Sequence, residues 1–204
     1  MCLFLDVISP LPEFLLIEDN KVILKRKIIK KMTDKLSDNI FETYTEINKS
    51  YNLNQNLKKI SITLGPGSFT SLRVGAAFVS GLIISNDLLF SPFTINDIFN
   101  FNLSNFKFKS SGIFITSGNN QNFFCVSNKE NKVEFFKLED NSFILPKHID
   151  KIFYNKNKFD SSYVKVRQVK FSFLKLFYEN YHKLDFLKGK LIKPIYISNN
   201  KILN

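Results

Sequence analysis

The sequence predicts an α/β protein of two related lobes, each a mixed sheet flanked by helices. Strand-like segments occur in threes, each set is followed by helix-like segments, and this order occurs twice along the chain. The 204 residues are 44% hydrophobic, enough for a globular core, and hold no uninterrupted apolar run of about 18 residues. We expect a first lobe over residues 1–101 and a smaller, degenerate lobe with a basic tail over residues 112–204.

Three strands are expected at the start of the chain. Residues 1–5 are continuously apolar, as in a strand that is buried on both faces. Residues 14–18 and 21–27 follow as two further strands, and the pair Asp19-Asn20 between them predicts a tight hairpin turn.

Two helices surround the next expected strand, residues 59–64. The first helix covers residues 33–51, with Thr33 as N-cap, because apolar side chains recur there at spacings of three and four. The second covers residues 68–84 and is rich in small residues, among them Gly75 and Gly81. Small residues at helical spacing leave a shallow groove, so a helix of this chain or of another protein can approach closely.

The second half of the chain repeats the pattern more weakly. A short strand at 88–90 precedes a short helix that begins with the capping-box pair Thr94 and Asp97. A polar connector at 102–111 leads to expected strands at 112–116, 123–127, 132–138, 151–154 and 163–166, and a helix is expected at 171–184. Two lobes of this kind match the actin-like (ASKHA) fold, in which both lobes are ribonuclease H-like.

The most specific motif joins the strand at 59–64 to the second helix. Residues 65–75 read Gly-Pro-Gly-Ser-Phe-Thr-Ser-Leu-Arg-Val-Gly. A strand that enters a glycine turn at a helix start can hold an anion on free backbone N–H groups. Thr70 and Ser71 stand where a Walker loop needs Gly and Lys, so the common phosphate loop is excluded. A structural turn and a nucleotide contact both stay open; the latter would use Gly65, Pro66, Gly67, Ser68, Phe69, Thr70 and Arg73.

Charge is distributed unevenly along the chain. Residues 1–150 hold 17 Lys/Arg and 15 Asp/Glu, whereas residues 151–204 hold 12 and 3, which gives balances of +2 and +9. A basic segment of this kind can meet RNA phosphates, although only three arginines occur in the chain. An RNA-binding accessory module is therefore one alternative function.

Several function classes lack their residues. Two cysteines, Cys2 and Cys125, make no disulfide framework and predict a reducing, cytoplasmic location, and the start of the chain lacks the basic region of a signal peptide. The two histidines, His148 and His182, have no ligand cluster around them, so no metal site is expected. Neither a His-Glu-x-x-His motif nor a Gly-x-Ser-x-Gly elbow occurs, which argues against a metallopeptidase and a serine hydrolase.

The motif at residues 65–75 closely resembles the signature of the bacterial tRNA threonylcarbamoyladenosine biosynthesis protein family TsaB (YeaZ). That family typically shows Gly-Pro-Gly-Ser-Phe-Thr-Gly-Leu-Arg-Ile-Gly, and here Ser71 and Val74 depart from it. Weaker similarities lie in Leu36 and Ile40 of the preceding helix and in Pro194 and Tyr196 near the end.

The departures from the family pattern affect the nucleotide region. Where the family's first strand ends Asp-Thr-Ser, this chain has Asp6-Val7-Ile8, which supplies no hydroxyl donors. The family's Asp-Ala-Arg of the second lobe is replaced by Thr116-Ser117-Gly118. No catalytic residue and no cofactor are therefore expected, while ATP or ADP binding by an ASKHA-type phosphotransferase stays open as an alternative.

The resemblance implies a non-catalytic scaffold subunit. Such a subunit would pair with TsaD, which carries the metal and transfers a threonylcarbamoyl group to the adenosine next to the anticodon of tRNAs. A TsaE-like ATPase would be associated, tRNA would be met indirectly, a homodimer could form in the absence of TsaD, and no membrane is involved. The two helices at 33–51 and 68–84 would form the interface, through Leu36, Ile40, Phe41, Phe69, Leu72, Gly75, Phe78 and Gly81.

Overall fold

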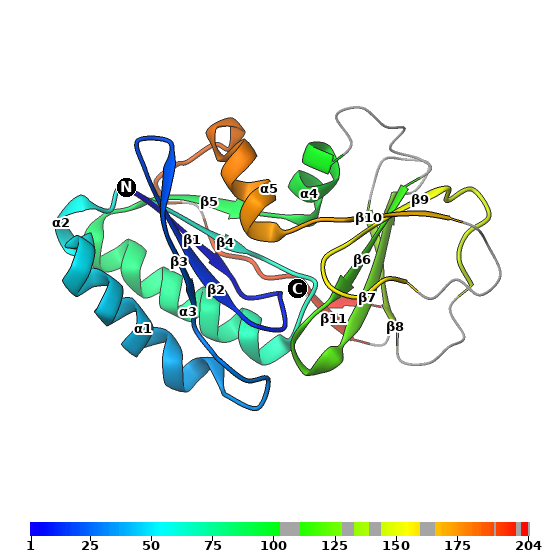
Figure 1. The fold of residues 1–204 in the computed structure, drawn as a ribbon, viewed down its shortest axis with the longest axis horizontal. Helices are drawn as coiled ribbons and strands as arrows, with labels where there is room; N and C mark the ends of the chain where they lie inside the picture. The colour runs from blue at the N-terminus through cyan, green and yellow to red at the C-terminus, as the bar shows by residue number, and fades with distance from the viewer. Residues whose placement is uncertain are drawn as a thin grey trace.

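Two five-stranded sheets with the same strand order form the framework (Figure 1). A computed structural model describes residues 1–102, 111–127, 133–138, 144–159, 166–189, 191–198 and 201–203. The first sheet has the order β3-β2-β1-β4-β5, in which β1 pairs antiparallel with β2 and parallel with β4. Its strands are β1 (Cys2–Asp6), β2 (Glu13–Glu18), β3 (Lys21–Lys27), β4 (Lys59–Thr63) and β5 (Leu89–Phe93).

The second sheet repeats this topology in the order β8-β7-β6-β9-β10. Its strands are β6 (Ser111–Thr116), β7 (Asn122–Ser127), β8 (Val133–Leu138), β9 (Lys151–Tyr154) and β10 (Arg167–Lys170). Here β6 pairs antiparallel with β7 and parallel with β9, as β1 does with β2 and β4. The sequence-based prediction of two related lobes with mixed sheets is thus what the structure shows.

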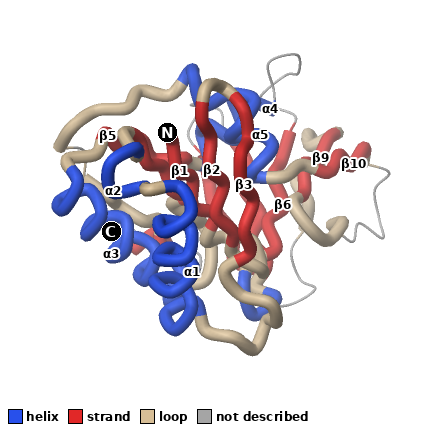
Figure 2. The backbone as a smooth tube through the Cα atoms, turned by 60° about the vertical axis from the view of Figure 1, so that its left-hand side comes forward, coloured by secondary structure: helices blue, strands red, loops and turns tan. Residues whose placement is uncertain are grey.

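Helices cover both faces of the first sheet (Figure 2). On one face lie α1 (Leu36–Tyr51) and α3 (Phe69–Asn86), which are linked through the short α2 (Leu53–Asn56) and β4. The predicted stripe of α1 is buried through Leu36, Ile40, Tyr44 and Ile47. On the other face lie α4 (Ile95–Asn102) and α5 (Phe173–Asn180). The predicted capping box begins α4, where the Asp97 carboxylate accepts both the N–H and the hydroxyl of Thr94 at 2.7 Å.

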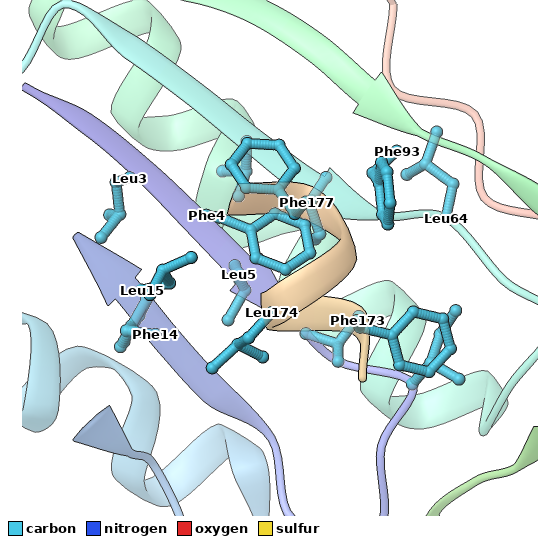
Figure 3. Close-up of a cluster of buried hydrophobic side chains, with 14 of the residues drawn as sticks. Leu3, Phe4, Leu5, Phe14, Leu15, Leu64, Phe93, Phe173, Leu174 and Phe177 are labelled. Atoms are coloured by element: carbon cyan, nitrogen blue, oxygen red, sulfur yellow. The ribbon is translucent and has the colours of Figure 1, made fainter. Parts of the chain in front are cut away.

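The chain returns to the first lobe after the second sheet, whereas the second lobe was expected to extend from residue 112 to residue 204. In α5, Phe177 stacks on Phe4 of β1 with ring centroids 4.0 Å apart (Figure 3). Further along, Leu187 exchanges two backbone hydrogen bonds with Phe90, and the Ile195 N–H donates to the Leu64 carbonyl at 2.7 Å. The second sheet therefore occupies residues 111–170, and much of the expected 112–204 lobe packs on the first.

The chain ends in a small hairpin that joins the two lobes. Its strands are β11 (Tyr196–Ser198) and β12 (Lys201–Leu203), and β11 lies against β8 of the second sheet. Because the preceding residue, Ile195, bonds to the first lobe, residues 194–198 act as a strap across both sheets.

Some local predictions need correction. Helix α1 begins at Leu36, with Lys35 and not Thr33 at the N-cap position. The segment before it forms a loop, which the Asp34 carboxylate closes by accepting the backbone N–H groups of Lys30 and Lys31. The strand expected at 163–166 falls mostly outside the described residues, and β10 begins at Arg167. The connector expected at 102–111 also falls largely outside them. The predicted turn at Asp19-Asn20 is confirmed, since both residues have positive φ.

Helix α3 is apolar in composition, yet most of its residues are not fully buried. Its mean hydropathy is 1.2 over 18 residues, with 17% of them buried, so by length and composition alone it could cross a membrane. Here it packs along the first sheet through Leu72, Gly75 and Val79. A single helix of this kind is weak evidence for a membrane span.

Candidate functional site

The glycine turn between β4 and α3 is buried. Gly65 has φ +108° and precedes a cis peptide bond to Pro66, and both residues are buried. A Cβ at Gly65 would lie 2.6 Å from the Ile195 carbonyl oxygen, so only glycine fits under the strap. Ser68 occupies the N-cap position of α3, but its side chain makes no capping hydrogen bond. The Ser68 hydroxyl therefore does not cap this helix.

Apolar side chains from the end of β1 fill the space beside this turn. A Cβ at Gly67 would lie 3.4 Å from a side-chain carbon of Ile8, which is fully buried. A Cβ at Gly75 would lie 2.7 Å from Val7 and 2.9 Å from Ile62, so this glycine lets α3 approach the sheet. Val7 and Ile8 thus place apolar side chains directly against the glycines of this motif.

The strap covers the outer side of the turn. The ring centroids of Tyr196 and Phe69 lie 4.7 Å apart. The Arg73 guanidinium also contacts Phe69, at 5.2 Å from the centroid of its ring. Phe69 is half exposed, and Thr70 and Arg73 are exposed. The end of the chain and the start of α3 therefore form one aromatic and cationic cluster.

The second lobe closes on the same place. A Cβ at Gly118 would lie 3.7 Å from the Ser68 Cβ, which puts the β6–β7 turn against the start of α3. The Asn155 side chain holds the end of β6, since its amide oxygen accepts the Thr116 N–H and its amide nitrogen donates to the Thr116 carbonyl, both at 2.8 Å. The carboxyl ends of β6 and β9 thus face the glycine turn.

Asp6 is buried at the end of β1 and stabilises the local turn. Its Oδ1 accepts the N–H groups of Ile8 at 2.9 Å and Ser9 at 3.2 Å. Its Oδ2 is buried and has no hydrogen-bond partner. Burial raises the pKa of this carboxyl to about 6. The side chain is 1% exposed, so Asp6 cannot meet a ligand in this conformation.

The residues expected to contact a nucleotide are divided between the interior and the surface of the described part of the chain. Of the residues expected to contact nucleotide, Gly65, Pro66 and Ser68 are buried, while Phe69, Thr70 and Arg73 reach the surface. Among the described residues, no group of three or more His, Cys, Asp or Glu side chains could hold a metal ion. Cavities of about 280 and 220 Å³ lie elsewhere, beside α5 and between β3 and α1, and no residue of the glycine turn lines either.

The residues expected at a partner interface divide into two groups. Leu36, Ile40, Leu72 and Gly75 are buried in the first lobe, because they face the sheet. Phe78 is partly buried between Phe14 and Tyr44, at ring distances of 6.0 and 5.4 Å. Phe41 is 70% exposed, and Gly81 has open space beyond it. Of this group, Phe41, Phe69 and Gly81 are the exposed residues, and Phe78 keeps a smaller exposed surface.

An exposed stripe runs along α3 on the side opposite the sheet. It consists of Arg73, Ala77, Gly81 and Ile84, at spacings of four, four and three. Phe41 precedes Tyr44 by three residues on α1, and the Tyr44 ring meets Phe78, so Phe41 flanks the seam between the helices. We call Phe41, Ala77, Gly81 and Ile84 the outer helix face.

Sequence reasoning missed two features here. The strap residues Ile195 and Tyr196 lie more than 100 residues from the turn that they cover, and only the Pro194-Ile195-Tyr196 similarity pointed to them. A basic loop over residues 28–35 was also missed, although its run of lysines was visible in the sequence.

This two-lobed α/β chain is similar to known proteins in both sequence and fold. The sequence model of the family described as "TsaD: tRNA N6-adenosine threonylcarbamoyltransferase" matches residues 28–187. YeaZ from Pseudomonas aeruginosa has the same fold, with a TM-score of 0.60 at 11% identity over 96% of this chain and 99% of that one. A protein described as similar to peptidase YeaZ from Pseudomonas aeruginosa gives 0.62 at 12% identity, over 97% and 99%. No curated protein matches the chain by sequence.

The chain therefore belongs to the family of that sequence model, which covers most of its length. The YeaZ structures confirm the expected two-lobed fold, with mixed sheets flanked by helices.

Proposed function

We propose that this chain is a non-catalytic scaffold subunit that pairs with a TsaD-like subunit in the threonylcarbamoyl modification of the adenosine next to the anticodon of tRNAs. The observation that carries the proposal is the outer helix face, an exposed apolar surface on α1 and α3 of a chain in the TsaD family. A helix of mean hydropathy 1.2 that buries 17% of its residues gains stability when a partner covers it.

The composition of the face suits a helix as partner. Ala77 and Gly81 have short or absent side chains, and a Cβ at Gly81 would meet nothing within 4 Å. A partner helix can therefore approach the α3 backbone there, with Ile84 on the same stripe and Phe41 on α1 as exposed apolar anchors. Residues buried beneath, such as Leu72 and Gly75, set the position of α3 without touching the partner.

The filled glycine turn supports a role without catalysis. Ile8 packs against Gly67, Val7 packs against Gly75, and the Ile195 carbonyl covers Gly65, so apolar side chains and the strap lie directly against these glycines. The buried Asp6 already bonds to Ile8 and Ser9. A nucleotide would have to displace both the apolar side chains and the strap.

Further partners follow from the same proposal. A TsaE-like ATPase would join the pair, tRNA would be met within the larger complex, and two copies would pair through the outer helix face when the TsaD-like subunit is absent. The assembly would work in the cytoplasm and without a cofactor on this chain.

The proposal is tested by deleting the gene and measuring tRNA nucleosides by mass spectrometry. We expect threonylcarbamoyladenosine to disappear, and to return with the wild-type gene but not with Ala77→Glu plus Gly81→Glu. The matched control is Ser50→Glu plus Asn54→Glu, which adds the same charge at exposed positions near the end of α1 and should restore the nucleoside. Full modification without the gene would refute the proposal, and isothermal titration that shows tight ATP binding would favour the phosphotransferase instead.

A further inference from the structure

A basic surface spans the two lobes at the edge where the glycine turn lies. Residues 25–35 read Lys-Arg-Lys-Ile-Ile-Lys-Lys-Met-Thr-Asp-Lys, with six basic side chains and one acidic one. The turn after β9 adds Lys156 and Lys158. We call Lys30, Lys31, Lys35, Lys156 and Lys158 the basic rim.

The fold brings these two segments together. Lys27 at the end of β3 is paired with Glu13, and Glu13 with Asp6 at the end of β1, so the loop after β3 starts at the edge of the glycine turn. In the second lobe, Asn155 is bonded to Thr116 at the same edge. The Lys156 ammonium then lies 3.9 Å from the Met32 sulfur, which joins the two loops across the lobes.

The loop after β3 is fixed by buried side chains and by hydrogen bonds to its backbone. Ile28 and Ile29 are buried, and the Ile28 N–H donates to the Pro12 carbonyl at 2.9 Å. The Asp34 carboxylate is turned inward onto the N–H groups of Lys30 and Lys31. The lysine side chains thus project from a fixed backbone, and a ligand need not order the loop.

The rim lysines keep their charges available. All five are exposed, and none forms an ion pair with any residue of the described part of the chain. Two other basic residues nearby face acids, since Arg26 forms an ion pair with Glu46 at 2.6 Å and Lys27 stands opposite Glu13 in the strand register. The nearest exposed acid on α1, Asp38, accepts the Ser37 hydroxyl at 2.8 Å.

We propose that the basic rim binds the phosphodiester backbone of a structured RNA across both lobes. A single phosphate needs several donors that converge in an enclosed site, whereas these lysines are spread over two loops on an open surface. Separated ammonium groups suit a regular polyanion, and each contact releases counterions. The choice of RNA among polyanions rests on the proposed function. The charge of the rim and the arrangement of its lysines are observed independently of that function.

The test uses the full chain with all five rim lysines changed to Gln. The control changes Lys21, Lys49, Lys58, Lys175 and Lys183 to Gln; these are exposed and lie at the far end of the first sheet or on and just after α5. Both variants lower the formal charge by five, from +11 to +6. Binding of a fluorescent tRNA transcript is measured by anisotropy at several salt concentrations. The rim variant should lose about tenfold or more in affinity at low salt, and its salt dependence should fall by about 2 to 4 in log–log slope.

The outcomes separate this inference from the proposed function. If the rim and control variants lost affinity equally, net charge alone would explain binding, and the proposal that the basic rim is the RNA-binding site would be wrong. Binding of anionic vesicles, but not tRNA, through the rim would also overturn it. A rim variant that loses tRNA but still co-purifies with the TsaD-like subunit is the result we expect. A wild-type chain that pairs without binding tRNA refutes only the rim, and one that binds tRNA through the rim without pairing refutes only the scaffold role.

Discussion

The two lobes share one strand order but cover their sheets differently. In the first lobe, the face that α1 and α3 cover is closed by helices of 16 and 18 residues. In the second, the corresponding strands β8, β9 and β10 have no helix between them among the described residues, and a small cluster of Phe114, Phe124 and Phe159 covers the face instead. The other face of the second sheet packs on the main core through Ile113, Ile115 and Phe123.

This difference shows where a binding surface can form. A layer of aromatic side chains leaves a nearly flat surface over a sheet. A pair of helices instead presents a groove between them and an exposed apolar stripe. The second lobe contributes its turn at Gly118 and its lysines at 156 and 158 to the edge of the first. The first lobe therefore carries the proposed partner surface, and the second completes the basic rim.

The largest expected effect compares the cores of the two lobes. Phe177→Ala removes a fully buried ring that stacks on Phe4, and it should cost about 3–5 kcal/mol in the free energy of unfolding. Phe159→Ala should cost clearly less because its ring is 9% exposed and belongs to the smaller buried cluster. Urea unfolding measures both, and equal losses would contradict the difference between the lobes.

A second comparison concerns two glycines of α3. Gly75→Leu forces a side chain against Val7 and Ile62 and should destabilise the fold by about 3 kcal/mol. Gly81→Leu points into open space and should leave stability unchanged or raise it by up to about 1 kcal/mol, because glycine is a poor helix former. If both substitutions had the same effect on thermal unfolding, the assignment of inner and outer helix faces would be wrong.

The buried Asp6 predicts a pH dependence that belongs to the first lobe. Its pKa is raised by burial from 3.8 to about 6, so the folded state binds the proton more tightly than the unfolded state. Stability from this group is present in full below about pH 4 and is lost as pH rises through about 6. Asp6→Asn should remove this loss and be more stable at pH 7 by on the order of 2 kcal/mol.

The measurement for Asp6 is the difference in unfolding free energy between the wild type and Asp6→Asn at steps from pH 3.5 to 7. Taking the difference cancels groups that do not interact with Asp6, whereas Glu13, whose charge also raises the pKa of Asp6, is coupled to it and contributes to the difference. A difference that stays constant over this range would show that Asp6 has an ordinary pKa.

The smallest effect compares the caps of α4 and α5, which pack on the shared face. Thr94→Ala removes the hydroxyl that donates to the Asp97 carboxylate at 2.7 Å and accepts the Asp97 N–H at 3.3 Å, and it should cost about 1 kcal/mol. Ser172→Ala removes a single cap contact of 3.4 Å to the Lys175 N–H at an exposed site, and a loss of a few tenths is expected. Chemical denaturation resolves the two, and a larger loss at Ser172 would reverse this order.

Local patterns predicted the elements well because local chemistry determines them. The Asp19-Asn20 turn, the α1 stripe and the Thr94–Asp97 capping box each depend on residues a few positions apart. The return of α5 to β1 and the strap on Gly65 were missed, since both join residues more than 100 positions apart. Helical spacing also showed that Gly75 and Gly81 lie on α3 without showing that one meets the sheet and the other solvent.

The most direct test of this account is the affinity between the purified chain and its TsaD-like subunit. It can be measured by sedimentation velocity for the wild type, for Ala77→Glu plus Gly81→Glu, and for Ser50→Glu plus Asn54→Glu. We expect the wild type and the latter variant to form a one-to-one complex, and the outer-face variant to remain folded but sediment separately. A complex of undiminished affinity with charged residues at 77 and 81 would contradict the outer helix face as the docking surface.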